Sequence, residues 1–121
     1  MSKKVLIVDD SIYMRTLISD ALTGAGYEVV GQAANGHDAI ELSKSLLPDL
    51  ITLDNILPDA MGLDLLPQIK DFSNTSKILM ISAVGQQTVI NRGKTLGADD
   101  YIVKPFDKEG LVEKVQSLMN N

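Results

Sequence analysis

Short runs of apolar residues recur along this chain, separated by longer segments of mixed polarity. The runs are rich in Ile, Val and Leu and mostly lack polar alternation; they lie at Val5–Val8, Glu28–Ala33, Leu50–Leu53, Ile78–Ile81 and Tyr101–Val103. Strands that are buried on both faces have this pattern. The sequence therefore predicts five strands in a parallel sheet that is covered by helices.

The segments between these runs predict helices that each carry one apolar stripe. Ser11, Asn35 and Asp107 are suited to cap helix N-termini, and apolar residues recur at helical spacing after each of them. Gly24 can end the first of these helices, and Pro48 stops the second.

Two further helices are predicted, over Gly62–Asp71 and, more weakly, over Gln86–Leu96. Gly93 lies inside the second of them and costs about 1 kcal/mol relative to Ala. Either this glycine allows close packing against the sheet, or it keeps the helix loose because the helix moves. Repeated strand–helix–strand units give right-handed crossovers and an α/β fold with helices on both faces of the sheet. Ligands bind to such sheets beyond the carboxyl ends of the strands.

The bulk properties restrict the class of protein. A length of 121 residues predicts one domain over residues 1–121. The 16 acidic and 11 basic residues give a net charge of -5, which argues against direct nucleic-acid binding. The chain has no cysteine, which excludes disulfides and Cys-based metal sites. The apolar runs are too short for a membrane span or a signal peptide, so we expect a soluble cytoplasmic protein.

Polar residues whose side chains can take part in binding or catalysis follow four of the predicted strands. Asp9 and Asp10 follow the first strand, Asp54 the third, Ser82 the fourth and Lys104 the fifth. Because the carboxyl ends of parallel strands meet at one edge, we expect these groups to share one small rim. Each of them alone has a simpler explanation, such as a turn, a helix cap or an ordinary loop. Their joint occurrence favours a common site.

The charges at this rim narrow its chemistry. Two carboxylates about 5 Å apart repel by ~3 kcal/mol at an effective dielectric constant of 20, so such a site holds either a proton or a cation. Oxygen ligands without His or Cys favour magnesium, calcium or manganese, and a small ligand set that leaves room for a phosphate suits Mg²⁺. Three aspartates, one divalent ion and one lysine also balance in formal charge. The rim is therefore suited to a cation and a phosphoryl group.

Four motifs stand out at the ends of the predicted strands: VLIVDDS at residues 5–11, DNILPDAMG at 54–62, SAVGQQ at 82–87 and DYIVKPF at 100–106. They resemble the receiver domain of two-component response regulators, and in particular the stand-alone CheY-like regulators of chemotaxis. The resemblance covers the whole chain. It implies a flavodoxin-like fold with five parallel strands in the order 2-1-3-4-5.

The resemblance also implies which residues act in phosphorylation. Asp54 is similar to the phosphoacceptor, which takes a phosphoryl group from a sensor histidine kinase. Asp10, Asp54 and the backbone carbonyl of Ile56 would ligate Mg²⁺, and Asp9 would help through water. Phosphorylation and hydrolysis of its own Asp54 would be the only reactions that the protein catalyses, so it is not expected to be an enzyme for other substrates.

Three further residues take roles from the same resemblance. Lys104 would contact a phosphoryl oxygen and would be held by a cis peptide bond to Pro105. The hydroxyl of Ser82 would move to bond the phosphoryl group, and the Tyr101 ring would turn inward when it does. These parts suit an in-line transfer that depends on positioning and charge neutralisation.

Two positions that vary in the family bear on the lifetime of the phosphoryl group. Ile56 lies two residues after Asp54, and Val84 lies two residues after Ser82. In the family these positions flank the path of the hydrolytic water. Both are apolar here, so we expect slow self-dephosphorylation.

The resemblance places signal output on the fourth helix, the fifth strand and the fifth helix. The chain ends at Asn121, directly after the last predicted helix, so output is expected through contact with another protein. A flagellar motor switch protein is the expected target, and a phosphatase is a possible partner; neither nucleic acid nor membrane is expected. One alternative is a phosphorelay intermediate that passes its phosphoryl group to a histidine phosphotransfer protein. Another is a flavodoxin-like or small phosphatase-like enzyme that uses the acidic rim.

Overall fold

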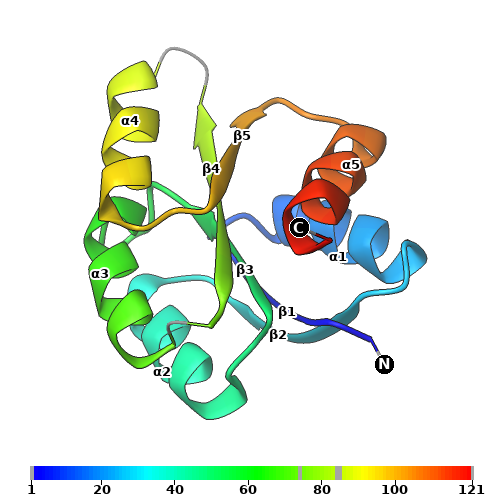
Figure 1. The fold of residues 1–121 in the computed structure, drawn as a ribbon, viewed down its shortest axis with the longest axis horizontal. Helices are drawn as coiled ribbons and strands as arrows, with labels where there is room; N and C mark the ends of the chain where they lie inside the picture. The colour runs from blue at the N-terminus through cyan, green and yellow to red at the C-terminus, as the bar shows by residue number, and fades with distance from the viewer. Residues whose placement is uncertain (1, 74, 84–85, 121) are drawn as a thin grey trace.

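A computed structural model describes residues 2–73, 75–83 and 86–120 of the chain (Figure 1). Strands and helices alternate along these residues in the order β1 (Lys4–Val8), α1 (Ile12–Gly24), β2 (Glu28–Ala33), α2 (Gly36–Leu46), β3 (Leu50–Asp54), α3 (Gly62–Phe72), β4 (Lys77–Ala83), α4 (Gln87–Leu96), β5 (Asp100–Lys104) and α5 (Lys108–Met119). The strands form one parallel sheet in the order β2-β1-β3-β4-β5. The predicted fold class and strand order are confirmed.

The two faces of the sheet carry separate halves of the core. Helices α2, α3 and α4 cover one face, and α1 and α5 cover the other (Figure 1). Alternate residues of each strand point to opposite faces, so Leu6 and Val8 pack beneath α2 and α3 while Val5 and Ile7 pack beneath α1 and α5. Burial on both faces explains why the central strands read as continuous apolar runs.

The predicted N-terminal caps are confirmed. The side chains of Ser11, Asn35 and Asp107 each accept a hydrogen bond from a backbone N–H in the first turn of α1, α2 and α5. The start of α1 is thereby fixed directly after the Asp9–Asp10 pair, which orients that turn at the edge of the sheet.

Three strands extend further at their carboxyl ends than the apolar runs predict. β3 continues to Asp54, β4 to Ala83 and β5 to Lys104, and the parallel ladder pairs Asp54 with Ile81 and Ala83 with Lys104. Backbone pairing does not depend on side-chain polarity, so the ladder continues after the apolar run ends. The polar residues at these ends are thus held by the sheet itself.

Gly93 lies where α4 approaches the sheet. It is buried, and a Cβ atom at this position would lie 2.8 Å from Sδ of Met80 on β4. This contact favours the interpretation that the glycine allows close packing.

Candidate functional site

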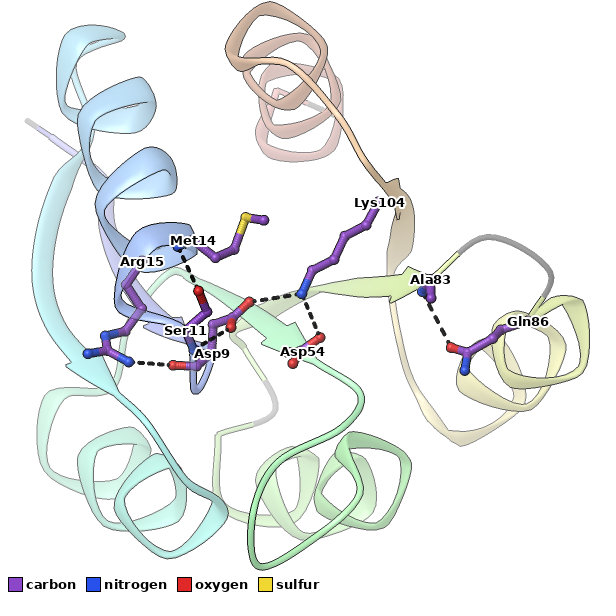
Figure 2. A network of polar contacts seen from close by, with 8 residues as sticks. All are labelled: Asp9, Ser11, Met14, Arg15, Asp54, Ala83, Gln86 and Lys104. Atoms are coloured by element: carbon purple, nitrogen blue, oxygen red, sulfur yellow. Dashed lines mark hydrogen bonds and ion pairs between the residues drawn. The ribbon is translucent and has the colours of Figure 1, made fainter.

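The ends of β1, β3 and β5 bring two carboxylates and one ammonium into contact (Figure 2). Lys104 Nζ lies 3.3 Å from Asp9 Oδ2 and 3.2 Å from Asp54 Oδ1. β1 and β3 are neighbours, so the two aspartates leave adjacent strands, and the long lysine side chain reaches them across β4. Both aspartates are buried, and the Lys104 side chain is 28% exposed. Because these three charges are shielded from bulk water, the attraction between the ammonium and the two carboxylates is strong.

The turn after β1 holds Asp9 through several backbone contacts. The N–H of Ser11 donates to Asp9 Oδ1 at 2.9 Å, and the Asp9 N–H donates to the Ala33 carbonyl at 3.0 Å. The Arg15 guanidinium donates to the Asp9 carbonyl at 2.7 Å (Figure 2). It also donates to Gln32 Oε1 at 3.2 Å. Arg15 is not among the predicted site residues, because an arginine one turn into a helix has the pattern of an ordinary surface residue.

Asp9, Asp10 and Asp54 form a candidate cation site. Each offers one carboxylate oxygen, and these three oxygens lie within 4.8 Å of one another. Asp9 and Asp54 are buried, whereas Asp10 is exposed and faces solvent. The donors are all hard oxygens, which are the ligands of Mg²⁺ and Ca²⁺. One ammonium cannot neutralise three carboxylates, so the residues present fit a divalent cation.

Burial and crowding change the proton affinity of this group. Burial, and after it the negative charge of Asp9, raises the pKa of Asp54 from 3.8 to about 6, although Lys104 opposes the rise. Burial of the Lys104 ammonium would lower its pKa, but the charges of Asp54 and Asp9 and their hydrogen bonds outweigh burial, so the pKa rises. At pH 7 the Asp54 carboxylate is therefore mostly ionised, and a further positive charge at the site would stabilise it.

The β3–α3 loop forms one wall of a pocket at the carboxyl end of β3. The pocket is lined by side chains from several elements, including Asp10, Asp54, Ile56, Gln86 and Lys104. The Ile56 side chain is 56% exposed at its mouth. Behind the loop, Gly62 packs so closely that a Cβ atom there would lie 2.6 Å from the carbonyl oxygen of Asp54. This contact holds the start of α3 close against the backbone at the end of β3.

Ser82 lies in β4 between two residues that line this pocket, and Tyr101 lies in β5 three residues before Lys104. Ser82 is buried, does not line the pocket, and its hydroxyl finds no hydrogen-bond partner among the described residues. Tyr101 is half-buried beneath α4, and the ammonium groups of Lys94 and Lys114 lie 5.0 and 5.5 Å from its ring centroid. The Lys104–Pro105 peptide bond is cis. Val84, which is expected to flank the path of the hydrolytic water, lies outside the described residues.

The comparisons with known proteins agree with this architecture. Residues 5–116 match the response regulator receiver domain, and the chain belongs to this family. It is 42% identical over 118 residues to the chemotaxis protein CheY of Thermotoga maritima, with 98% of each chain covered. The chemotaxis response regulator CheY4 of Vibrio cholerae has a TM-score of 0.89 at 32% identity, over 98% of this chain and 99% of that one. A chain of the CheX-CheY-BeF3-Mg²⁺ complex of Borrelia burgdorferi has a TM-score of 0.91 at 31% identity, over 96% of this chain and 88% of that one.

Membership of this family bears on one of the two alternatives to a CheY-like switch. CheY-like receiver domains are regulators and not conventional enzymes, so the interpretation as a small phosphatase-like enzyme is set aside. Among the described residues, no helix has the length and apolar character needed to cross a membrane.

Proposed function

We propose that this protein is a phosphorylation-dependent switch of a two-component system that accepts a phosphoryl group on Asp54 from a phosphohistidine of a sensor kinase. The observation that carries the proposal is the contact of the Asp54 carboxylate with the Lys104 ammonium at 3.2 Å, in a pocket that Asp10 also lines. An oxygen of Asp54 forms the new bond to phosphorus while the N–P bond breaks. The electron pair of that bond stays on the ring nitrogen of the histidine.

Mg²⁺ is the proposed cofactor of this transfer. Asp10, Asp54 and the Ile56 carbonyl would hold it, and Asp9 would assist through water. When bound, the ion supplies positive charge for the carboxylates and for the phosphoryl oxygens. Lys104 adds a further positive charge next to Asp54, where the incoming phosphoryl group brings negative charge.

Ser82 and Tyr101 are the proposed parts of the switch. The Ser82 hydroxyl is buried without a partner among the described residues, so a phosphoryl oxygen on Asp54 offers it an acceptor that it otherwise lacks. Its movement would leave space for the half-buried Tyr101 ring. Phosphorylation would thereby shift an existing equilibrium between two arrangements of the α4–β5–α5 face.

A role in chemotaxis is proposed from the relatives. The chain resembles CheY over nearly its full length, so a histidine kinase would supply the phosphoryl group and a flagellar motor switch protein would receive the signal in the cytoplasm. The CheX-CheY-BeF3-Mg²⁺ complex of a neighbour supports a further partner of the CheX kind. A phosphatase is a separate proposed partner. The experiment is capture of binding partners by the full chain with and without beryllofluoride and Mg²⁺.

The central test uses radiolabelled acetyl phosphate and Mg²⁺. The wild type is expected to become labelled in an acyl phosphate that hydroxylamine removes, and Asp54→Asn is expected to stay unlabelled. Label on Asp54→Asn, or equal labelling of the wild type in EDTA, would contradict the proposal. Transfer of label from Asp54 onto a histidine phosphotransfer protein would instead favour the phosphorelay alternative.

A further inference from the structure

The β3–α3 loop is a small hairpin that carries a proposed cation ligand on one side. Ile56 and Met61 form an antiparallel bridge, and the Leu57 N–H donates to the Ala60 carbonyl at 3.1 Å. Leu57 is buried in the core beneath α2 and α3, whereas the Ile56 side chain is exposed. The hairpin is therefore anchored at its inner side. The orientation of its tip depends on the contacts that the tip makes with other elements. The position of the Ile56 carbonyl follows from that orientation.

Asp59 at this tip is bound to the first turn of α2. Its Oδ1 accepts from the Gly36 N–H at 2.7 Å, and its Oδ2 accepts from the His37 N–H at 3.0 Å. A glycine suits this contact, because a Cβ atom at position 36 would lie 3.0 Å from Cβ of Ala60 and 3.2 Å from Asp59 Oδ1, which is a tight fit. One carboxylate thus joins two elements that begin after different strands.

The chemistry of this contact makes it a specific clamp. The first N–H groups of a helix have no partner within the helix, and the positive end of the helix dipole favours a carboxylate there. The two backbone hydrogen bonds lower the pKa of Asp59, so it is ionised at neutral pH. The side chain is exposed, so packing does not hold it; these two bonds do.

We infer that Asp59 is a positioning residue for the cation site: by clamping the tip of the β3–α3 loop to α2, it sets the place of the Ile56 carbonyl. The inference rests on the proposed Mg²⁺ site. The coupling is reciprocal, as linkage requires, so a cation at the site orders the first turn of α2. Asp59 holds the loop without touching the phosphoryl group.

Mg²⁺ affinity, measured by titration calorimetry on the full chain, tests the clamp. Asp59→Ala removes both acceptors and is expected to weaken Mg²⁺ binding roughly tenfold, the lower end for residues that orient a metal ligand, because Leu57 still anchors the loop. Asp59→Asn keeps one acceptor and is expected to lie between Asp59→Ala and the wild type. Asp64→Asn removes an equal charge from the exposed face of α3 and is the matched control, with affinity near that of the wild type.

Two results would overturn the inference. One is an Asp59→Ala affinity within about twofold of both the wild type and Asp64→Asn. The other is an equal loss in Asn35→Ala, which removes the acceptor for the Asp38 N–H in α2 but leaves the clamp intact. In that case the stability of α2, and not the clamp, would set the affinity.

Amide hydrogen exchange provides a second measurement that does not depend on phosphorylation. Mg²⁺ is expected to slow exchange at the Gly36 and His37 amides of the wild type and to leave them unchanged in Asp59→Ala. Equal Mg²⁺-induced protection in both proteins would contradict the coupling. Failure of the wild type to bind Mg²⁺ at all would instead refute the proposed function, so the two failures can be told apart.

Discussion

Replacing Asp54 by asparagine should stabilise the protein in the absence of divalent cations. The substitution keeps the shape of the side chain and removes its charge. Asp54 is buried next to Asp9, and these two factors raise its pKa from 3.8 to about 6. Lys104 remains paired with Asp9 at 3.3 Å after the change, so the ammonium is not left alone. The wild type at pH 7 therefore carries an unfavourable charge that the variant lacks.

The magnitude follows from the difference between the folded and unfolded proton affinities. The folded state binds this proton more tightly, with a pKa of about 6 against 3.8. The free energy of unfolding therefore falls as pH rises between these values, and the loss is complete above about pH 6. At ~1.4 kcal/mol per pKa unit the loss is ~3 kcal/mol. The new amide brings a buried N–H₂ group that costs about 1 kcal/mol, so we expect Asp54→Asn to gain ~2 kcal/mol at pH 7.5.

Urea denaturation in EDTA at pH 7.5 and pH 4 measures this effect. The stability difference between Asp54→Asn and the wild type should be largest at pH 7.5. It should be much smaller at pH 4, where Asp54 of the wild type is protonated in the folded state and about 40% protonated in the unfolded state. Asp64→Asn removes an exposed carboxylate and should change stability by no more than about 0.5 kcal/mol. A variant that is no more stable than the wild type at pH 7.5, or a gap that is equal at both pH values, would refute the reasoning.

Three further predictions concern packing, polar burial and phosphoryl lifetime. Gly62→Ala would place a Cβ atom 2.6 Å from the Asp54 carbonyl oxygen, so urea denaturation should show a free energy of unfolding lower by about 1–3 kcal/mol. The control is Gly24→Ala, whose Cβ atom meets nothing within 4 Å and which should raise the free energy of unfolding by up to about 1 kcal/mol. Equal effects of the two substitutions would contradict the role of the contact. Thr52→Val removes a buried hydroxyl that has no partner among the described residues and should stabilise by about 1 kcal/mol in the same assay; a clear loss would show that the hydroxyl is bonded in solution. Ile56→Asn, at the exposed mouth of the pocket, should shorten the half-life of the acyl phosphate in a label-decay assay, and an unchanged or longer half-life would remove the idea that this apolar side chain slows hydrolysis.

The fold could be predicted from the sequence because apolar runs and helix-capping residues alternate along the chain, and together they indicate a regular succession of strands and helices. The apolar runs marked every strand, and Ser11, Asn35 and Asp107 marked helix starts that the structure confirms. The strand ends were less accurate, because apolar patterning stops at Leu53 while the ladder continues to Asp54. Patterning reports burial, and hydrogen bonding across a sheet can extend beyond it.

The parts of the site that escaped prediction depend on contacts between distant segments. Asp59 follows a proline in a turn, where an aspartate needs no partner outside the turn. Its bonds to Gly36 and His37 join positions that only the packing of α2 against α3 brings together. Arg15 likewise has the sequence context of a solvent-facing helix residue, and its contact with the Asp9 carbonyl depends on how the turn after β1 packs. No local pattern carries such information.

The position of Lys104 at the end of the last strand has a consequence for when the site can form. Its partners Asp54 and Asp9 lie 50 and 95 residues earlier in the chain. A growing polypeptide that has completed only β1 to β4 holds the acidic side chains but no ammonium to offset them. During synthesis, competence for signalling would therefore arise in one late step, after β5 has left the ribosome and docked, and a chain cut short before that strand would lack a balanced site.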